Sequence, residues 1–179
     1  MMTDARDSIL PAELVELARR VVDENRAAGR RVALAESCTG GLVAAALTEI
    51  AGSSDVVEAG YVTYSNEAKV AALDVSGDLI DTFGAVSIAV AWNMAQGALA
   101  KSGADVAVSV TGVAGPGGGS AKKPVGTVVF ARALKGQDPA DVHALKREFG
   151  DLGRGGVRLQ AALCALELLL PSPPAPAAP

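Results

Sequence analysis

Apolar residues follow two different spacings along the chain, and the switches between them divide it into expected helices and strands. Helical spacing or strongly helix-forming composition occurs in five stretches, residues 11–28, 42–47, 67–73, 86–102 and 155–170. Short apolar runs typical of strands lie at residues 31–36, 57–64, 105–110 and 125–133. Because these strands alternate with helices, we predict an α/β fold, a three-layer α/β/α sandwich around a largely parallel or mixed central sheet.

The chain is predicted to form one domain over residues 1–170. Its 179 residues lie within the usual size of a single domain and suffice to bury a core without disulfides or metals. Half of the residues are apolar but only 3% are aromatic, so Ala, Val and Leu must build that core. Residues 171–179 are Pro and Ala apart from Ser172, and we predict a disordered tail there.

The charge of the chain and the length of its apolar runs disfavour two partners, nucleic acid and the membrane. The net charge is −4, and Lys and Arg residues are scattered rather than clustered, which disfavours nucleic acid as a partner. The most apolar stretch, residues 159–170, is interrupted by Gln160 and Glu167 and is too short to span a bilayer, so no membrane anchor is expected. Cys38 and Cys164 are too far apart for a metal knuckle, and no apolar signal segment precedes the first polar residues. We therefore expect a cytoplasmic protein.

The first candidate for chemistry is the segment Glu-Ser-Cys-Thr-Gly-Gly from Glu36 to Gly41, which joins an expected strand to an expected helix. Where a parallel strand leads into a helix, backbone N–H groups and small side chains meet in a crevice that suits an anion or an oxyanion. A plain helix cap, with Ser37 or Thr39 satisfying a free amide, explains the same residues equally well.

The second candidate is the glycine-rich loop at residues 111–119, which has glycines at positions 112, 115, 117, 118 and 119. Bare backbone could approach a phosphate or a ribose there, although the loop lacks the Gly-Lys-Ser/Thr ending of a P-loop. Lys122 and Lys123 follow the loop, and we interpret both as solvated surface lysines.

The third candidate is Tyr64-Ser65-Asn66 followed by Lys69, where a strand ends in a polar turn and a helix begins. A helix start disfavours a cation, and partial burial adds to that effect, so the neutral amine of Lys69 is a candidate general base. Taken alone, the segment fits an exposed helix lysine better. His143 is the only histidine, which disfavours a Ser-His-Asp triad and a histidine-rich metal site.

These three segments, in this order, resemble the CinA C-terminal domain family. The resemblance covers residues 14–170, nearly all of the predicted domain. Members are known as nicotinamide mononucleotide deamidases or PncC amidohydrolases, so the resemblance implies hydrolysis of a carboxamide to nicotinic acid mononucleotide and ammonia, a step in pyridine nucleotide recycling. It implies a serine–lysine dyad and neither a metal nor an organic cofactor.

The resemblance also assigns catalytic roles to residues of this chain. Lys69 matches the base that takes a proton from a serine and later gives it to the departing ammonia. Ser37 and Ser54 both match the polar pocket, and we favour Ser37 as the nucleophile. Thr111 would orient the substrate or help to form an oxyanion hole, and Tyr64 would hydrogen-bond the lysine or the ribose.

Substrate binding is expected at the two glycine loops and at one arginine. An arginine at a helix start suits bidentate binding of a phosphate, and we favour Arg154 over Arg158 for that role. The family pattern Gly-Asp-Arg is here stretched to Gly-Asp-Leu-Gly-Arg over residues 150–154. The expected binding residues are Thr39, Gly40, Gly41, Gly112, Gly115, Gly117 and Arg154.

Two other functions were weighed against the amidohydrolase. A non-catalytic partner-binding module is the first, because the family name is also attached to competence and DNA-damage responses. A phosphate-ester hydrolase is the second, but it normally requires carboxylates arranged around a metal, and no such acidic cluster stands out in the sequence. For the favoured function, the partner is a small-molecule mononucleotide. We also expect a homo-oligomer, because a site at the rim of so small a domain is often completed by a neighbouring chain.

Overall fold

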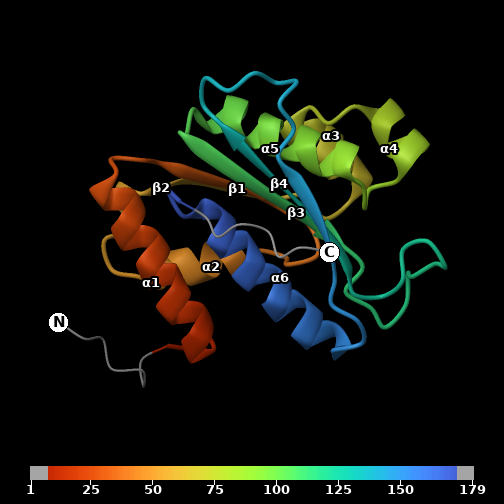
Figure 1. The fold of residues 1–179 in the computed structure, drawn as a ribbon, viewed down its shortest axis with the longest axis horizontal. Helices are drawn as coiled ribbons and strands as arrows, with labels where there is room; N and C mark the ends of the chain where they lie inside the picture. The colour runs from red at the N-terminus through yellow and green to blue at the C-terminus, as the bar shows by residue number, and fades with distance from the viewer. Residues whose placement is uncertain (1–7, 173–179) are drawn as a thin grey trace.

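The computed structural model describes residues 8–172, which form a five-stranded mixed sheet between two layers of helices. In Figure 1, α1, α2 and α6 lie on one face of the sheet, and α3, α4 and α5 lie on the other. The predicted three-layer α/β/α sandwich is confirmed. The predicted disordered tail falls largely on residues 173–179, which lie outside the described residues.

The sheet has the strand order β2-β1-β3-β4-β5. Its strands are β1 (Val32–Glu36), β2 (Val57–Val62), β3 (Val106–Gly112), β4 (Thr127–Leu134) and β5 (Ala144–Glu148). β1 pairs in parallel with β2 and β3, whereas β4 and β5 are antiparallel additions. In the register, Glu36 lies opposite Val62 and Val110, so the carboxyl ends of the three parallel strands meet at one edge.

The first helical layer is formed by α1 (Ala12–Ala27), α2 (Leu42–Thr48) and α6 (Gly153–Leu169). Buried Val, Leu and Ala side chains of these helices pack on alternate strand residues, such as Val32 and Leu34 of β1. Phe130 of β4 is the large aromatic residue in this layer, and its ring meets Phe149 edge-on at 6.5 Å. The described core is therefore mainly aliphatic, as the composition predicts.

The second helical layer is formed by α3 (Asn66–Leu73), α4 (Gly77–Phe83) and α5 (Ile88–Ser102). Ala33 and Ala35, which alternate with the β1 residues of the first layer, pack against this second layer. α5 approaches α3 so closely that a Cβ atom added to Gly97 would lie 2.0 Å from the backbone oxygen of Leu73. Glycine at this position lets the two helices pack directly on each other.

Two elements were missed by the sequence patterns. α4 is only seven residues long and begins at a glycine, so it gives little periodic signal. β5 is an edge strand with the sequence Ala-Leu-Lys-Arg-Glu; it overlaps the polar stretch at residues 141–147 and shows no alternation of apolar and polar positions typical of a strand. His143 itself is exposed and pairs with Asp141 at 3.3 Å.

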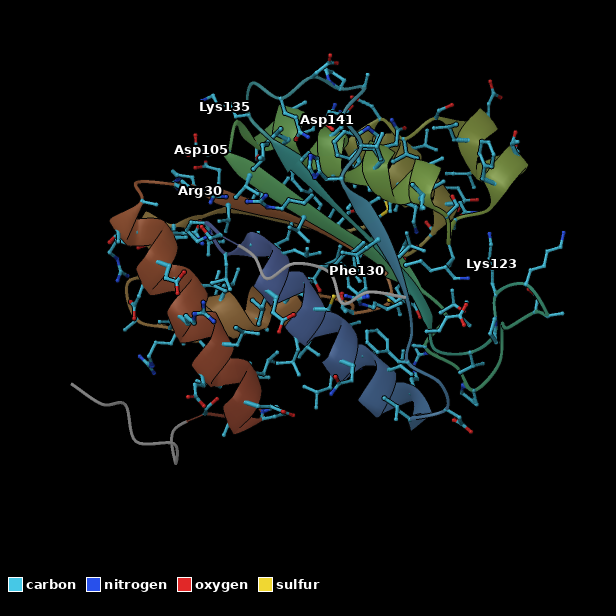
Figure 2. The ribbon with its side chains drawn as sticks, in the orientation of Figure 1. Arg30, Asp105, Lys123, Phe130, Lys135 and Asp141 are labelled. Atoms are coloured by element: carbon cyan, nitrogen blue, oxygen red, sulfur yellow. The ribbon has the colours of Figure 1, made fainter. Side chains whose placement is uncertain are left out.

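The two ends of the sheet differ in their surroundings. Figure 2 shows Arg30, Asp105 and Lys135 near one another at the end where β1 and β3 begin, whereas Lys123 lies at the other end, beside the glycine-rich loop. At that second end, the chain leaves β1 toward α2 on one face and leaves β2 toward α3 on the other face. Connections that diverge in this way open a crevice outside the strand ends. Within residues 8–172, no helix is both long and apolar enough to cross a membrane.

Candidate active site

Ser37 occupies the first position after β1, at the carboxyl edge of the sheet. Its backbone N–H donates to Val110 O at 2.9 Å, and its carbonyl oxygen accepts from Gly40 N at 3.0 Å. These bonds fix the serine between the neighbouring strand β3 and the turn that leads to α2. Ser37 lines a pocket of about 270 Å³, together with residues of the glycine-rich loop and of α3.

Lys69 lies in the first turn of α3 and is buried, with 1% of its surface exposed. Its Nζ is 3.1 Å from Ser37 Oγ and donates to the carbonyl oxygen of Thr63 at 3.0 Å and that of Tyr64 at 3.5 Å. The exposed-lysine alternative is therefore wrong. The structure brings the expected base and the favoured serine together within hydrogen-bond distance.

The surroundings of Lys69 favour its neutral form. Burial lowers the pKa of its amine, because removal from water disfavours the charged state. The neighbouring Cys38 thiol opposes this change to a smaller extent. Burial also raises the pKa of Cys38 to about 11, so this thiol stays protonated near neutral pH. Of these two neighbouring side chains, Ser37 is the one that Lys69 hydrogen-bonds.

The turn that carries Ser37 is anchored by Glu36, a residue to which the sequence patterns gave no role. The Glu36 carboxylate is 1% exposed and points toward α2, on the opposite face of the strand from Ser37. It accepts four hydrogen bonds, from Thr39 Oγ1 at 2.6 Å, Gly41 N at 3.0 Å, Val43 N at 3.2 Å and Ala44 N at 2.9 Å. An acidic residue ending a buried apolar strand was the available signal for such an anchor.

Thr111 lines the pocket near the end of β3. Its side chain is buried and donates from Oγ1 to Ala85 O at 3.0 Å, which ties the end of β3 to the segment before α5. The next residue, Gly112, approaches β4 closely, since an added Cβ would lie 2.8 Å from Thr127 O. Gly112, Gly115 and Gly117 all line the pocket, as expected for the glycine-rich loop.

Arg154 closes the pocket from the first turn of α6. It donates from Nη1 to Gly115 O at 2.8 Å and from Nη2 to Tyr64 Oη at 2.9 Å. The arginine therefore joins the glycine-rich loop to the turn before α3. Arg158, the alternative, instead donates to Thr39 O at 2.9 Å and does not line the pocket.

Four of the expected site residues take other positions. Ser54 is exposed in a short 3-10 helix (Ser53–Asp55) before β2. Because Ser37 follows β1 and the two strands are parallel, Ser54 lies at the opposite edge of the sheet and does not line the pocket, so its catalytic role stays a prediction. Thr39, Gly40 and Gly41 do not line the pocket. The Thr39 hydroxyl and the Gly41 amide bind Glu36, and the Gly40 amide binds Ser37 O, so these groups are not turned to a ligand.

Residues 8–172 contain no group of three or more His, Cys, Asp or Glu side chains placed to hold a metal ion. A hydroxyl, a buried amine of lowered pKa and a nearby arginine can activate a nucleophile and bind an anionic group.

The fold and the site together define an α/β domain with a buried serine–lysine pair at the carboxyl edge of its parallel strands. Residues 14–172 match the CinA C-terminal domain, and the chain belongs to that family. It is 51% identical over 157 residues to the nicotinamide-nucleotide amidohydrolase PncC of Enterobacter agglomerans, covering 88% of this chain and 93% of that protein. Against the PncC of Escherichia coli, the identity is 47% over 159 residues, with the same coverage.

A solved structure supports the same assignment. The competence/damage inducible protein CihA from Agrobacterium tumefaciens superimposes with a TM-score of 0.86 at 51% identity, covering 90% of this chain and 96% of that one. Longer relatives also match. The chain covers 33% of a CinA-like protein of Mycolicibacterium vanbaalenii, to which it is 52% identical over 142 residues.

Proposed function

We propose that this protein is a metal-independent amidohydrolase that converts nicotinamide mononucleotide to nicotinic acid mononucleotide and ammonia by means of a Ser37–Lys69 dyad. The observation that carries the proposal is the 3.1 Å contact between Lys69 Nζ and Ser37 Oγ in a buried pocket. The proposed substrate rests on the PncC relatives, which are similar over 88% of the chain and are named nicotinamide-nucleotide amidohydrolases.

The first half-reaction forms an ester. In the neutral amine, two N–H bonds face the carbonyls of Thr63 and Tyr64, and the lone pair faces Ser37 Oγ. Lys69 takes the hydroxyl proton as Oγ attacks the carboxamide carbon. The resulting lysine ammonium then protonates the substrate nitrogen, the C–N bond breaks, and ammonia leaves an acyl group on Ser37.

The second half-reaction reverses these roles. Lys69 takes a proton from a water molecule, which attacks the acyl carbon, and returns that proton to Ser37 Oγ as the ester bond breaks. The product forms as a carboxylic acid, which gives its proton to the released ammonia, and the enzyme regains its starting state. No redox partner is needed, since hydrolysis consumes only water.

The negative charge on the substrate oxygen requires hydrogen-bond donors in the pocket. Within the described residues, the Gly40 and Gly41 amides are already bound to Ser37 O and to Glu36, whereas the Cys38 amide donates to no backbone carbonyl. We assign the oxyanion to the Cys38 N–H, the amide that follows the nucleophile. Thr111 and the glycine-rich loop line the same pocket as Cys38.

The phosphate is assigned to the mouth of the pocket, at Arg154. Two of the five N–H donors of this guanidinium bind Gly115 O and Tyr64 Oη, which leaves the others for a phosphate. Tyr64 and the backbone of Gly117 would contact the ribose, since all three residues line the same pocket.

The test is ammonia release from nicotinamide mononucleotide by the purified protein in EDTA. Wild-type turnover that is lost in Ser37→Ala and Lys69→Ala, with folding retained, would support the proposal. An inactive wild type would favour a non-catalytic partner-binding module instead. A role in pyridine nucleotide recycling, a cytoplasmic location, the absence of a nucleic-acid partner and a homo-oligomeric state stay predictions.

A further inference from the structure

Glu36 hydrogen-bonds two separate segments of the chain, one through its side chain and the other through its main-chain oxygen. Its side chain binds the Thr39 hydroxyl and the amides of Gly41, Val43 and Ala44. Its main-chain oxygen accepts from Thr63 N at 2.8 Å. Thr63 in turn offers its own carbonyl to Lys69 Nζ at 3.0 Å. A single buried residue is thus bonded to the turn of the serine and to the segment that holds the lysine.

Capping of α2 does not by itself explain this arrangement. The residue before the helix, Gly41, has φ 95° and no side chain with which to cap it. A Ser or Asp adjacent to the helix would satisfy one or two free amides locally. Here the acceptor comes from a strand residue five positions before Gly41, and Ser37 lies inside the segment that the carboxylate closes. The bonds therefore restrict the serine as well as the helix.

The carboxylate has hydrogen bonds but no ion pair among the described residues. A buried anion is costly to desolvate unless its oxygens are bonded, and these oxygens accept four donors. Loss of one donor would leave a buried oxygen less well satisfied, at a cost in stability. The four bonds together hold the conformation of residues 36–44.

We propose that Glu36 is a positioning residue that holds Ser37 Oγ within reach of Lys69 Nζ, acting through its side-chain bonds to the turn and its main-chain bond to Thr63. This inference rests on the proposed function, because it treats Ser37 and Lys69 as the reacting pair. Glu36 touches neither the substrate nor the reacting atoms.

The test uses Glu36→Gln, which preserves size but turns an NH₂ group toward backbone donors. We expect kcat to fall by about ten- to a hundredfold, as for a misplaced reacting group, with KM within about threefold of wild type. The pH at which kcat/KM is half-maximal should stay unchanged, because the surroundings of the Lys69 amine are kept. Thr39→Val, which removes only the hydroxyl bond, should lower kcat less and guards against a Glu36 variant that fails to fold.

A structural control separates positioning from lost stability. Asn25 is buried in α1, where its Nδ2 donates to Val21 O and to Leu169 O at 2.8 and 3.0 Å, outside the pocket. Asn25→Ala should lower the melting temperature while kcat per folded molecule stays at the wild-type value. Wild-type kcat in both Glu36→Gln and Thr39→Val would overturn the proposal.

A second measurement keeps this result apart from the proposed function. An organic fluorophosphonate phosphonylates an activated serine with loss of fluoride, without need of the natural substrate, and mass spectrometry locates the adduct. If the wild type is labelled at Ser37 but releases no ammonia from nicotinamide mononucleotide, the substrate is wrong. The role of Glu36 is then decided by the labelling rate, which should fall at least tenfold in Glu36→Gln; an unchanged rate would refute it.

Discussion

Arg154 and Tyr64 lie 90 residues apart in the chain, and their side chains meet at 2.9 Å, from Nη2 to Oη. The same guanidinium reaches Gly115 O at 2.8 Å, so one planar group joins three separate segments of the pocket. Lysine has no planar fork with which to make both bonds. The two bonds of Arg154 thus hold the glycine-rich loop and the turn before α3 together at the pocket.

Replacement of Arg154 by lysine should raise KM for the mononucleotide about tenfold with a smaller change in kcat, since one bond to a charged group contributes about 1.5 kcal/mol. Tyr64→Phe should raise KM as well. The double variant should show less than the product of the two effects, because both remove the same contact. Steady-state kinetics of the four proteins measures this coupling, and independent effects would contradict it.

The rate should rise with pH, since the reaction needs the neutral amine of Lys69. Burial lowers the pKa of this amine from 10.5, so the rising limb of kcat/KM must have its midpoint below pH 10.5. A profile from pH 5 to 10 measures it. A limb that stays at the pKa of free lysine would show that the amine is hydrated in solution.

Stability should depend on pH through the same residue. Lys69 binds its proton less tightly in the folded chain than in the unfolded chain, so between its lowered pKa and 10.5 its contribution to the free energy of unfolding increases with pH. Lys69→Met removes the cost of burying the amine and should stabilise the protein at neutral pH by on the order of 1 kcal/mol. Urea unfolding at pH 7 and pH 10 should show this gain shrinking as the pH rises.

Substitutions of the two candidate serines should have different effects on kcat. Ser54→Ala should retain kcat within about twofold, because exposed surface substitutions have small effects and this serine lies at the far edge of the sheet. Ser37→Ala should lower kcat by at least a thousandfold, as expected on loss of a nucleophile. Ammonia release by the two variants, side by side, decides between them. Loss of activity in Ser54→Ala would place the nucleophile elsewhere.

Gly97→Ala should destabilise the fold, because the added methyl group has no room between α3 and α5. The added Cβ would lie 2.0 Å from Leu73 O, so α3 and α5 must move apart. Such overpacking costs about 1 to 3 kcal/mol. Thermal or urea denaturation measures the loss, and Gly77→Ala, where nothing lies within 4 Å of the added atom, is the matched control.

Local patterns predicted most of the fold because the buried strands and long helices are strongly periodic. They failed for α4, which is too short to show a period, and for β5, whose Lys-Arg-Glu ending protects a sheet edge and resembles a loop. Chain direction alone could have placed Ser54, because it precedes its strand whereas Ser37 follows one.

The sequence predicted those residues of the candidate site that stand in conspicuous polar or glycine-rich segments. Lys69 and Ser37 stand in conspicuous polar segments, and the structure brings them together. The bonds of Glu36 to Ala44 and of Arg154 to Tyr64 join residues eight and ninety positions apart, and no local spacing indicates such partners. Those contacts exist only once the sheet has set the strand ends side by side.

The burial of Lys69 bears on how the protein responds to ionic strength. Exposed ion pairs weaken as ionic strength increases, because mobile ions screen them within about 8 to 10 Å. Lys69 owes its lowered pKa first to burial and not to an exposed ion pair, so mobile ions have little to screen. The fraction of neutral Lys69 amine at a given pH should therefore be nearly the same in buffers of low and of high ionic strength.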